Sequence, residues 1–208
     1  MTKSNRNLHG NVPDVSATAL LLLDVISDFE FPDSEQLFPH GMAIVSALTT
    51  LKAKAREAGI PAIYVNDNFG RWTSDFRRLL EHCLCDGVRG EPIARALAPL
   101  DDDYSVLKPK HSGFFGTTLG LVLKYLRSES LIITGFTTDI CVAFTAADAY
   151  MREYRLWIPS DCTASVETRH KNAALSYMER VLRADVRPST AVDLRTFHNS
   201  RHDSLRND

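Results

Sequence analysis

Short apolar runs alternate along this chain with longer segments of helical hydrophobic spacing. Each run is rich in Leu, Ile or Val and ends at a polar residue, which is typical of strands buried in a parallel sheet. The runs predict five strands and a weaker sixth: 18–23, 61–66, 104–107, 130–134, 155–158 and 185–187. Because helical segments separate them, successive strands are predicted to form βαβ units.

The helical segments follow the strands. Ile44, Leu48, Leu51 and Ala55 recur at the spacing of an amphipathic helix, and Gly59 follows as a stop signal. Residues 118–126 and 171–182 show the same pattern, whereas 141–151 are apolar on nearly every face and predict a deeply buried helix.

This order of elements predicts an α/β fold, a three-layer sandwich around a doubly wound, mainly parallel sheet with strand order 3-2-1-4-5-6. A chain of 208 residues and 23.2 kDa suits a single domain. We place that domain at 17–194, after an N-terminal extension (1–16) and before a polar C-terminal arm (195–208). Both ends lack hydrophobic periodicity, so they are candidates for mobile segments or subunit arms.

Composition narrows the class of protein. Hydrophobic residues make up 44% of the chain, charged residues 24%, and the net charge is −2, which excludes disorder and gives no basic surface for nucleic acid. The longest apolar run, residues 19–23, is too short to span a membrane, and the N-terminus lacks the apolar core of a signal peptide. We therefore expect a cytoplasmic protein with no nucleic-acid or membrane partner and with its cysteines as thiols.

Candidate chemistry lies at the strand ends. In a doubly wound sheet, ligands bind beyond the carboxyl ends of the strands, where strand order reverses. Asp24 follows the first strand, Lys108 the third, and Cys141 opens the helix after the fourth. The topology therefore predicts an acid, a base and a thiol in one crevice.

Each of these residues has a simpler interpretation. A lone cysteine in an apolar helix is usually a small buried hydrophobe, an aspartate after a strand can cap a turn, and a lysine can be a solvated charge. A helix N-terminus and a nearby ammonium, however, favour the thiolate. Their coincidence at one sheet edge favours a catalytic interpretation.

Three segments carry a resemblance to a known family: LLLLDVISDF (20–29), VLKPKHSGFFGT (106–117) and ITGFTTDICVAFTAADA (133–149). The chain resembles the isochorismatase-like cysteine hydrolases, which include nicotinamidases, N-carbamoylsarcosine amidohydrolase and ureidoacrylate amidohydrolase. The resemblance implies a catalytic triad of Asp24, Lys108 and Cys141. It also implies a cis peptide between Phe136 and Thr137, and an oxyanion hole made by the backbone N–H groups of Thr137 and Cys141.

The chain departs from the family pattern at two places. Ile26 stands where many members have glutamine, which removes a polar group from near the pocket. Nicotinamidases have an Asp-x-His metal motif after the second strand, whereas here Phe69 occupies the position of the second ligand. No histidine pair has ligand spacing, and Cys83 and Cys85 form a CxC with no second pair, so we expect neither a metal nor another cofactor. Cys162 is predicted to be a packing residue.

Four residues on loops near the strand ends are candidates for substrate contact: Phe29, Asn68, Trp72 and Phe114. Most aromatic residues belong to cores, so each of the three aromatics has that alternative. Asn66, Asp67 and Asn68 could equally cap the turn that leaves the second strand.

The predicted function is hydrolysis of an amide or carbamoyl C–N bond in a small molecule through a thioester on Cys141. Two alternatives stay open: isochorismatase-type hydrolysis of a vinyl ether, and a binding protein that keeps the fold without turnover. The resemblance also implies a homo-oligomer, a dimer or tetramer. Trp157, on the edge strand, is either exposed for such an interface or covered by the last helix.

Overall fold

The apolar runs pair as parallel strands of one sheet in the computed structural model, which describes residues 15–199. The sheet order is β3-β2-β1-β4-β5, and β6 pairs with β4. The strands are β1 (Thr18–Leu23), β2 (Ala62–Asp67), β3 (Tyr104–Lys108), β4 (Ser130–Phe136), β5 (Arg155–Trp157) and β6 (Thr163–Ala164). The predicted α/β class and the order 3-2-1-4-5 are confirmed, and the chain reverses direction across the sheet between β1 and β4.

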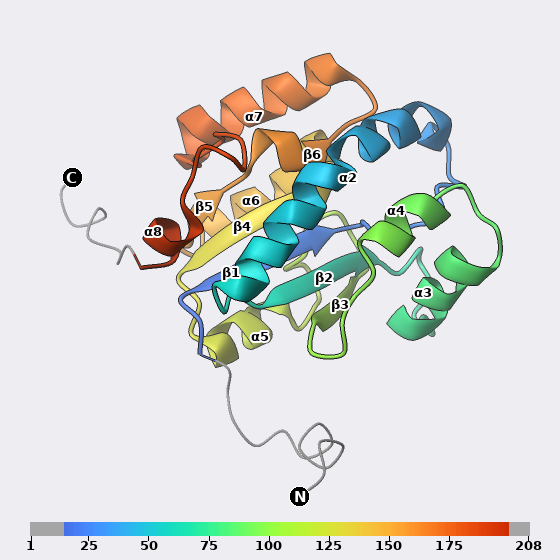
Figure 1. The fold of residues 1–208 in the computed structure, drawn as a ribbon, viewed down its shortest axis with the longest axis horizontal. Coiled ribbons are helices and arrows are strands. Elements are labelled where there is room, and N and C mark those ends of the chain that lie inside the picture. The colour runs from blue at the N-terminus through green and yellow to red at the C-terminus, as the bar shows by residue number, and fades with distance from the viewer. Residues whose placement is uncertain (1–14, 200–208) are drawn as a thin grey trace, which may run out of the picture.

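Helices cover both faces of this sheet. They are α2 (Ser34–Glu57), α3 (Phe76–Cys85), α4 (Glu91–Ala96), α5 (Leu119–Leu126), a π-helix (Thr138–Val142), α6 (Ala143–Tyr150), a 3₁₀ turn (Ser160–Cys162), α7 (Thr168–Leu182) and α8 (Leu194–Asn199). Figure 1 shows α2 crossing in front of the central strands. None of the helices within residues 15–199 has both the length and the apolar character that a membrane span needs.

The alternation of side chains along β1 builds the two halves of the core. Leu20 and Leu22 pack with α2 and α4, whereas Leu21 and Leu23 pack with α5, α6 and α7 on the opposite face. All six residues of β1 are buried, as expected for a central strand covered on both faces. The three predicted layers are therefore present.

The sixth strand is not where the sequence predicts it. Residues 185–187 contribute a single bridge, from Asp185 to Trp157, rather than a strand. The observed β6 has two residues and pairs with the end of β4. Two residues are too short to give an apolar run, so hydrophobic patterning cannot detect this strand.

The helix predicted at residues 141–151 is also different. It begins earlier, as a π-helix, and it is not deeply buried, because Phe144 is 54% and Met151 70% exposed. A helix that is apolar all round shows no preferred face in its sequence, and here only one side packs on the sheet.

Part of the C-terminal arm is folded. The ring of Phe197 in α8 lies 5.6 Å from that of Trp157 between centroids, and the Trp157 indole N–H donates to the carbonyl of Arg187 at 3.0 Å. Trp157 is fully buried, so of the two interpretations the cover by the last helix is correct. The predicted N-terminal extension (1–16) and the arm lie mostly outside the described residues.

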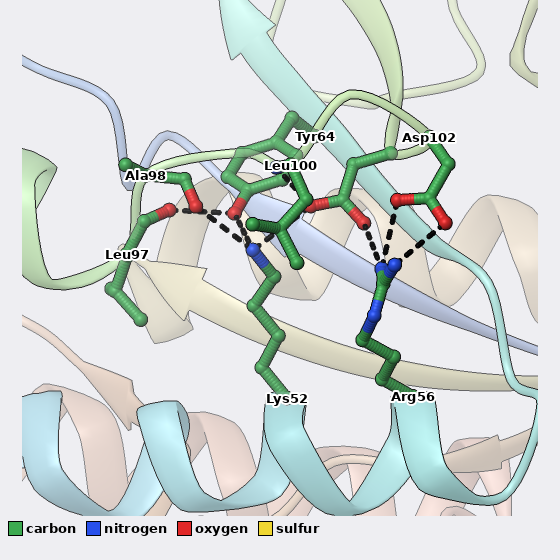
Figure 2. A network of polar contacts seen from close by, with 8 residues as sticks. Lys52, Arg56, Tyr64, Leu97, Ala98, Leu100 and Asp102 are labelled. Carbon is green, nitrogen blue, oxygen red and sulfur yellow. Dashed lines mark hydrogen bonds and ion pairs between the residues drawn. The ribbon is translucent and has the colours of Figure 1, made fainter. Parts of the chain in front are cut away.

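A partly buried lysine connects α2 to the edge of the sheet. Figure 2 shows Lys52 reaching from α2 toward Tyr64 and Ala98. Its ammonium donates to the Tyr64 hydroxyl at 2.7 Å and to the Ala98 carbonyl at 2.9 Å, and it pairs with Asp103 at 2.9 Å. These contacts fix the segment between α4 and β3.

Candidate active site

The functional candidates meet at the carboxyl edge of the sheet. Asp24 follows β1, Lys108 ends β3, and Cys141 lies in the π-helix that follows β4. Asp67, the last residue of β2, is in direct register with Lys108. Parallel strands bring their carboxyl ends to one edge, so residues from four separate segments become neighbours.

Lys108 is the centre of this cluster. Its Nζ lies 2.9 Å from Asp24 Oδ2, 3.4 Å from Asp67 Oδ2 and 3.4 Å from Cys141 Sγ. The Asp24 carboxylate also interacts with the Cys141 thiol. The other carboxylate oxygen of Asp24, Oδ1, accepts the backbone N–H of Asp67 at 2.7 Å. Asp24 is thereby held between the ammonium, the thiol and a backbone donor.

Asp67 is the residue whose part in this cluster the sequence analysis missed. The second strand was predicted to end at Asn66, one residue short, and Asp67 was considered only as a turn cap or polar contact. The sequence did contain a signal for it, because ligands bind beyond the carboxyl ends of parallel strands. Asp67 lies at the carboxyl end of the second strand, as Asp24 and Lys108 lie at the ends of theirs. Asn66 links the end of β2 to the loop after β1, because its side-chain amide donates to the carbonyl of Ile26 at 2.7 Å.

The backbone around the cluster takes uncommon conformations. Asp24, Phe29 and Phe69 all have positive φ, at 53°, 55° and 52°. Non-glycine residues rarely adopt this region, and such residues concentrate at functional sites. Gly135, at φ +103°, lets β4 approach β1 so closely that a Cβ there would lie 2.0 Å from the Leu23 carbonyl oxygen. The Phe136–Thr137 peptide that follows is cis.

Burial and neighbouring charges set the protonation of the cluster. Burial raises the pKa of the Cys141 thiol to about 12; the charge of Asp24 acts in the same direction, and Lys108 opposes it. Burial also raises the pKa of Asp24 above its ordinary value, again opposed by Lys108. Burial lowers the pKa of Lys108, but the charges of Asp24, Cys141 and Asp67 more than compensate and raise it overall.

These shifts change one argument made from the sequence. The sequence places a helix N-terminus and a lysine near the thiol, and both groups lower the pKa of a thiol and favour the thiolate. That expectation leaves out the groups that raise the pKa. Burial and Asp24 outweigh Lys108 here, so the raised pKa of Cys141 favours the thiol over the thiolate. Asp24 is the carboxylate that lies beside this thiol.

A cavity of about 330 Å³ opens over Asp24 and Cys141. Most of its wall is apolar, and the polar contributions come from a few side chains and the loop after β4. Its lining residues are Asp24, Ile26, Ser27, Phe29, Phe31, Leu37, Asn66, Asp67, Phe69, His111, Phe136, Thr137, Ile140 and Cys141. A mainly apolar cavity with convergent polar groups is the usual form of a small-molecule site.

Of the four predicted substrate contacts, Phe29 lines this cavity and the other three lie elsewhere. Asn68 is buried and its Oδ1 accepts the N–H of Gly70 at 2.9 Å, so it caps the turn after β2. Trp72 is 78% exposed outside the cavity. Phe114 packs in the opposite half of the core, under Arg152. Aromatic type and loop position do not reveal the direction of a side chain, so the sequence could not separate these cases.

The loop after β3 is fastened to the helix that follows the nucleophile candidate. The Ser112 hydroxyl donates to Asp148 of α6, and Arg152 donates to the other oxygen of that carboxylate at 2.7 Å. The Gly113 N–H donates to the Thr145 hydroxyl at 2.9 Å. These contacts fix the segment that carries Lys108 relative to the segment that carries Cys141.

No metal centre is evident in the described part of the chain. Among residues 15–199, no group of three His, Cys, Asp or Glu side chains is placed to hold an ion. Cys83 and Cys162 are buried free thiols in the core, in line with a packing role, and Cys85 is exposed. Metal independence stays a prediction for experiment.

The fold and this cluster define a class: doubly wound α/β proteins with a cysteine, a lysine and an aspartate at the carboxyl edge of the sheet. Residues 18–188 match the Isochorismatase domain, and the chain belongs to the isochorismatase family. The chain is 43% identical over 168 residues to the "Uncharacterized isochorismatase family protein YaaI" of Bacillus subtilis, covering 81% of this chain and 92% of that protein.

Two further relatives have named activities. The chain is 29% identical over 174 residues to the "Isochorismatase" of Bacillus subtilis, covering 80% of this chain and 54% of that protein. It is also similar to the crystal structure of N-carbamoylsarcosine amidase from Thermoplasma acidophilum, with a TM-score of 0.63 and 27% identity over 85% of this chain and 98% of that one.

Proposed function

We propose that the protein is a metal-independent cysteine hydrolase that cleaves the C–N bond of a small amide or carbamoyl compound. The observation that carries this proposal is the position of Lys108 between Asp24 and Cys141, beneath a cavity of small-molecule size. The similarity to an N-carbamoylsarcosine amidase supports the bond type.

The reaction begins with proton transfer. As the substrate carbonyl carbon approaches, Asp24 takes the proton from the Cys141 thiol and the sulfur forms a bond to that carbon. Lys108 stabilises the negative charge that passes from the carboxylate to the sulfur. The carbonyl oxygen becomes an oxyanion, for which the backbone N–H groups of Thr137 and Cys141 are the proposed donors.

Collapse of this intermediate breaks the C–N bond. Asp24 returns its proton to the departing nitrogen, which leaves as ammonia or an amine, and the acyl group stays on Cys141 as a thioester. A water molecule then gives a proton to Asp24 and attacks the thioester carbon. The C–S bond breaks, the acid leaves, and the proton on Asp24 returns to sulfur.

A panel assay tests this proposal. Ammonia release would be measured over nicotinamide, N-carbamoyl amino acids, ureido compounds, biuret and simple aliphatic and aromatic amides, with the Cys141→Ala protein as the matched control. Release that requires Cys141, together with a thioester adduct trapped on Cys141 and seen by mass spectrometry, would support the mechanism. No release from any amide would contradict it.

Hydrolysis of a vinyl ether is a second candidate, because the curated isochorismatase relative matches over most of this chain. In this candidate the cysteine need not form a covalent intermediate. Pyruvate release from isochorismate by both the wild-type protein and Cys141→Ala would favour it over amide hydrolysis.

We also propose that the protein is a homo-oligomer, and the family resemblance remains the main reason. Trp157 no longer supports assembly, because α8 covers it. The exposed apolar side chains of Phe144, Tyr150 and Met151 on and after α6 support it instead. Light scattering tests this: a mass near 23.2 kDa at micromolar concentration would contradict assembly.

A further inference from the structure

The charges around the cavity are unequally distributed. Asp24 and Asp67 both line it, whereas none of its lining residues in the described chain is Lys or Arg. The nearest ammonium, on Lys108, is fully buried behind the wall and already contacts both carboxylates. One ammonium against two carboxylates leaves the cluster with a net negative charge.

Arg89, a cation near the cavity, is directed elsewhere. Arg89 donates to the Phe29 carbonyl at 2.9 Å and pairs with Glu35 at 2.9 Å, and it is not part of the cavity wall. Among the described lining residues, His111 has the remaining basic side chain. A carboxylate bound in the cavity would therefore meet two aspartates and no lysine or arginine in the described wall.

Asp67 is the carboxylate that a substrate group would meet beside the reacting atoms. The Asp67 side chain is 35% exposed, and that of Asp24 is 18% exposed. The Lys108 ammonium lies 3.4 Å from the Asp67 carboxylate and 2.9 Å from that of Asp24, so Asp24 has the closer contact. Asp67 Oδ1 also accepts the Phe69 N–H at 2.6 Å, which holds the carboxylate at the cavity wall. Asp67 is therefore both fixed and incompletely neutralised.

The remaining wall is suited to an uncharged group. Ile26, Phe29, Leu37, Phe136 and Ile140 present apolar surface to the cavity. Transfer of a charged group against such a wall costs free energy unless a partner offsets it, and like charges nearby add to that cost.

We propose that the cavity selects uncharged substrates with a compact apolar or aromatic acyl group and excludes those that carry a carboxylate, and that Asp67 is the residue that sets this selection. The inference rests on the proposed amide hydrolysis at Cys141 and names its substrate class. It distinguishes this chain from relatives whose named substrates carry a carboxylate, which include both the isochorismatase and the N-carbamoylsarcosine amidase.

Charge selection can be measured without knowing the substrate. Iodoacetamide and iodoacetate alkylate the same sulfur and differ in charge. The rate ratio of the two reagents at Cys141, measured by peptide mass spectrometry at about pH 8 and low ionic strength with EDTA present, would be compared with the ratio for N-acetylcysteine amide. We expect the neutral reagent to be favoured at Cys141 by about tenfold more than at the free thiol.

Two variants with the same change in net charge test whether Asp67 causes the preference for the neutral reagent. Asp67→Asn should lower the excess preference at Cys141 severalfold, because it removes one negative charge from the cavity wall. Asp102→Asn makes the same change in net charge at the opposite end of the sheet and should leave the ratio unaltered. Equal ratios at Cys141 and the free thiol, or equal effects of the two variants, would overturn the assignment. A Cys141 that reacts with neither reagent would overturn it together with the proposed nucleophile.

Matched amides extend the test to turnover. Pentanamide, succinamate and 4-aminobutanamide are similar in length and carry no charge, a negative charge and a positive charge. We expect kcat/KM to be highest for pentanamide and lowest for succinamate, with Asp67→Asn narrowing that difference. Preference for succinamate would overturn the inference while leaving amide hydrolysis intact, and so would equal rejection of both charged amides. Failure of every amide would instead refute the proposed function.

Discussion

Two lysines, Lys52 partly buried and Lys108 fully buried, lie at opposite ends of the sheet and make similar contacts with different consequences. Lys52 has three good acceptors: the Tyr64 hydroxyl at 2.7 Å, the Ala98 carbonyl at 2.9 Å and the Asp103 carboxylate at 2.9 Å (Figure 2). Lys108 has one partner as close, Asp24 at 2.9 Å, and two at 3.4 Å, one of which is the sulfur of Cys141.

The difference lies in the partners rather than in the lysines. Burial and the charge of Asp103 raise the pKa of Tyr64, so the phenol stays neutral and the Lys52 cluster has no nucleophile. A cavity of about 410 Å³ lies beside Lys52, larger than the one over Cys141. Cavity size alone therefore does not single out the candidate active site. The thiol beside a carboxylate and an ammonium is the feature that favours the smaller cavity.

The largest expected effect is the loss of the sulfur. Cys141→Ser should keep the fold and lower kcat/KM by at least about a thousandfold, because a hydroxyl is far less acidic than a thiol and the cluster has no histidine base. Circular dichroism would verify the fold, and steady-state kinetics on the best amide of the panel would give the rate. Turnover close to that of the wild type would remove the main distinction between the two lysine clusters.

Exchanging the two lysines for methionine should separate activity from stability. Lys108→Met should lower kcat/KM by about a hundredfold or more, because the charge on sulfur and Asp24 loses its partner. Lys52→Met should lower the free energy of unfolding by about 3 kcal/mol, because Asp103, only 5% exposed, loses its closest cation and keeps only Arg56 at 3.9 Å. Urea titration and kinetics on both variants make the test.

The two variants, Lys52→Met and Lys108→Met, should differ in opposite ways in activity and in stability. Lys52→Met should keep kcat/KM within a small factor of the wild type at temperatures where it is folded. Lys108→Met should lose less stability than Lys52→Met, because Asp24 and Asp67 face the cavity and can be hydrated. If both variants lost activity and stability in parallel, Lys108 would be a structural residue like Lys52.

The pH dependence should follow the raised pKa values of Asp24 and Cys141. Alkylation of Cys141 should accelerate about tenfold per pH unit between about pH 7 and 10 without a plateau, since the thiol pKa is raised to about 12. Lys108→Met should slow it further, because the lysine is the group that lowers this pKa, and Lys52→Met should not change it. A plateau below about pH 8 would show a thiolate at rest.

Turnover should be lost on the acid side. Asp24 must be ionised to accept the thiol proton, and its pKa is raised above the ordinary carboxyl value, so kcat/KM should fall as the pH drops through that raised value. Lys52→Met should retain the wild-type profile, which would assign the acidic limb to the Lys108 cluster. An acidic limb at or below the ordinary carboxyl range would contradict the role given to Asp24.

The smallest expected effect is that of a chelator. Each cluster places an ammonium in contact with a carboxylate, and no group of metal ligands lies within residues 15–199. Exhaustive treatment with EDTA should leave turnover unchanged. Activity that collapses and returns with zinc would show that Asp67, which ends the strand where nicotinamidases have a metal motif, belongs to a metal site instead.

The sequence alone was sufficient for the elements with strong patterning. Five strands and the cores of α2, α5 and α7 follow from apolar runs and helical spacing, because burial on one or both faces is written directly into the order of residues. Asp24, Lys108 and Cys141 could be named because parallel strands must bring their carboxyl ends to one edge. Three elements were missed: α4 and β6 are too short to give a clear pattern, whereas α3 is strongly amphipathic and its pattern was overlooked.

Only the tertiary structure decided which side chains point into the cavity and in which direction the pKa of Cys141 is shifted. Phe29 and Phe114 are both aromatic residues near the same edge, yet one lines the cavity and the other packs under Arg152, because side-chain direction depends on loop conformation. The sequence placed a cation and a helix end near the thiol, but the pKa of Cys141 depends on burial by residues distant in the chain. Burial is a property of the assembled fold, so no local pattern could supply it.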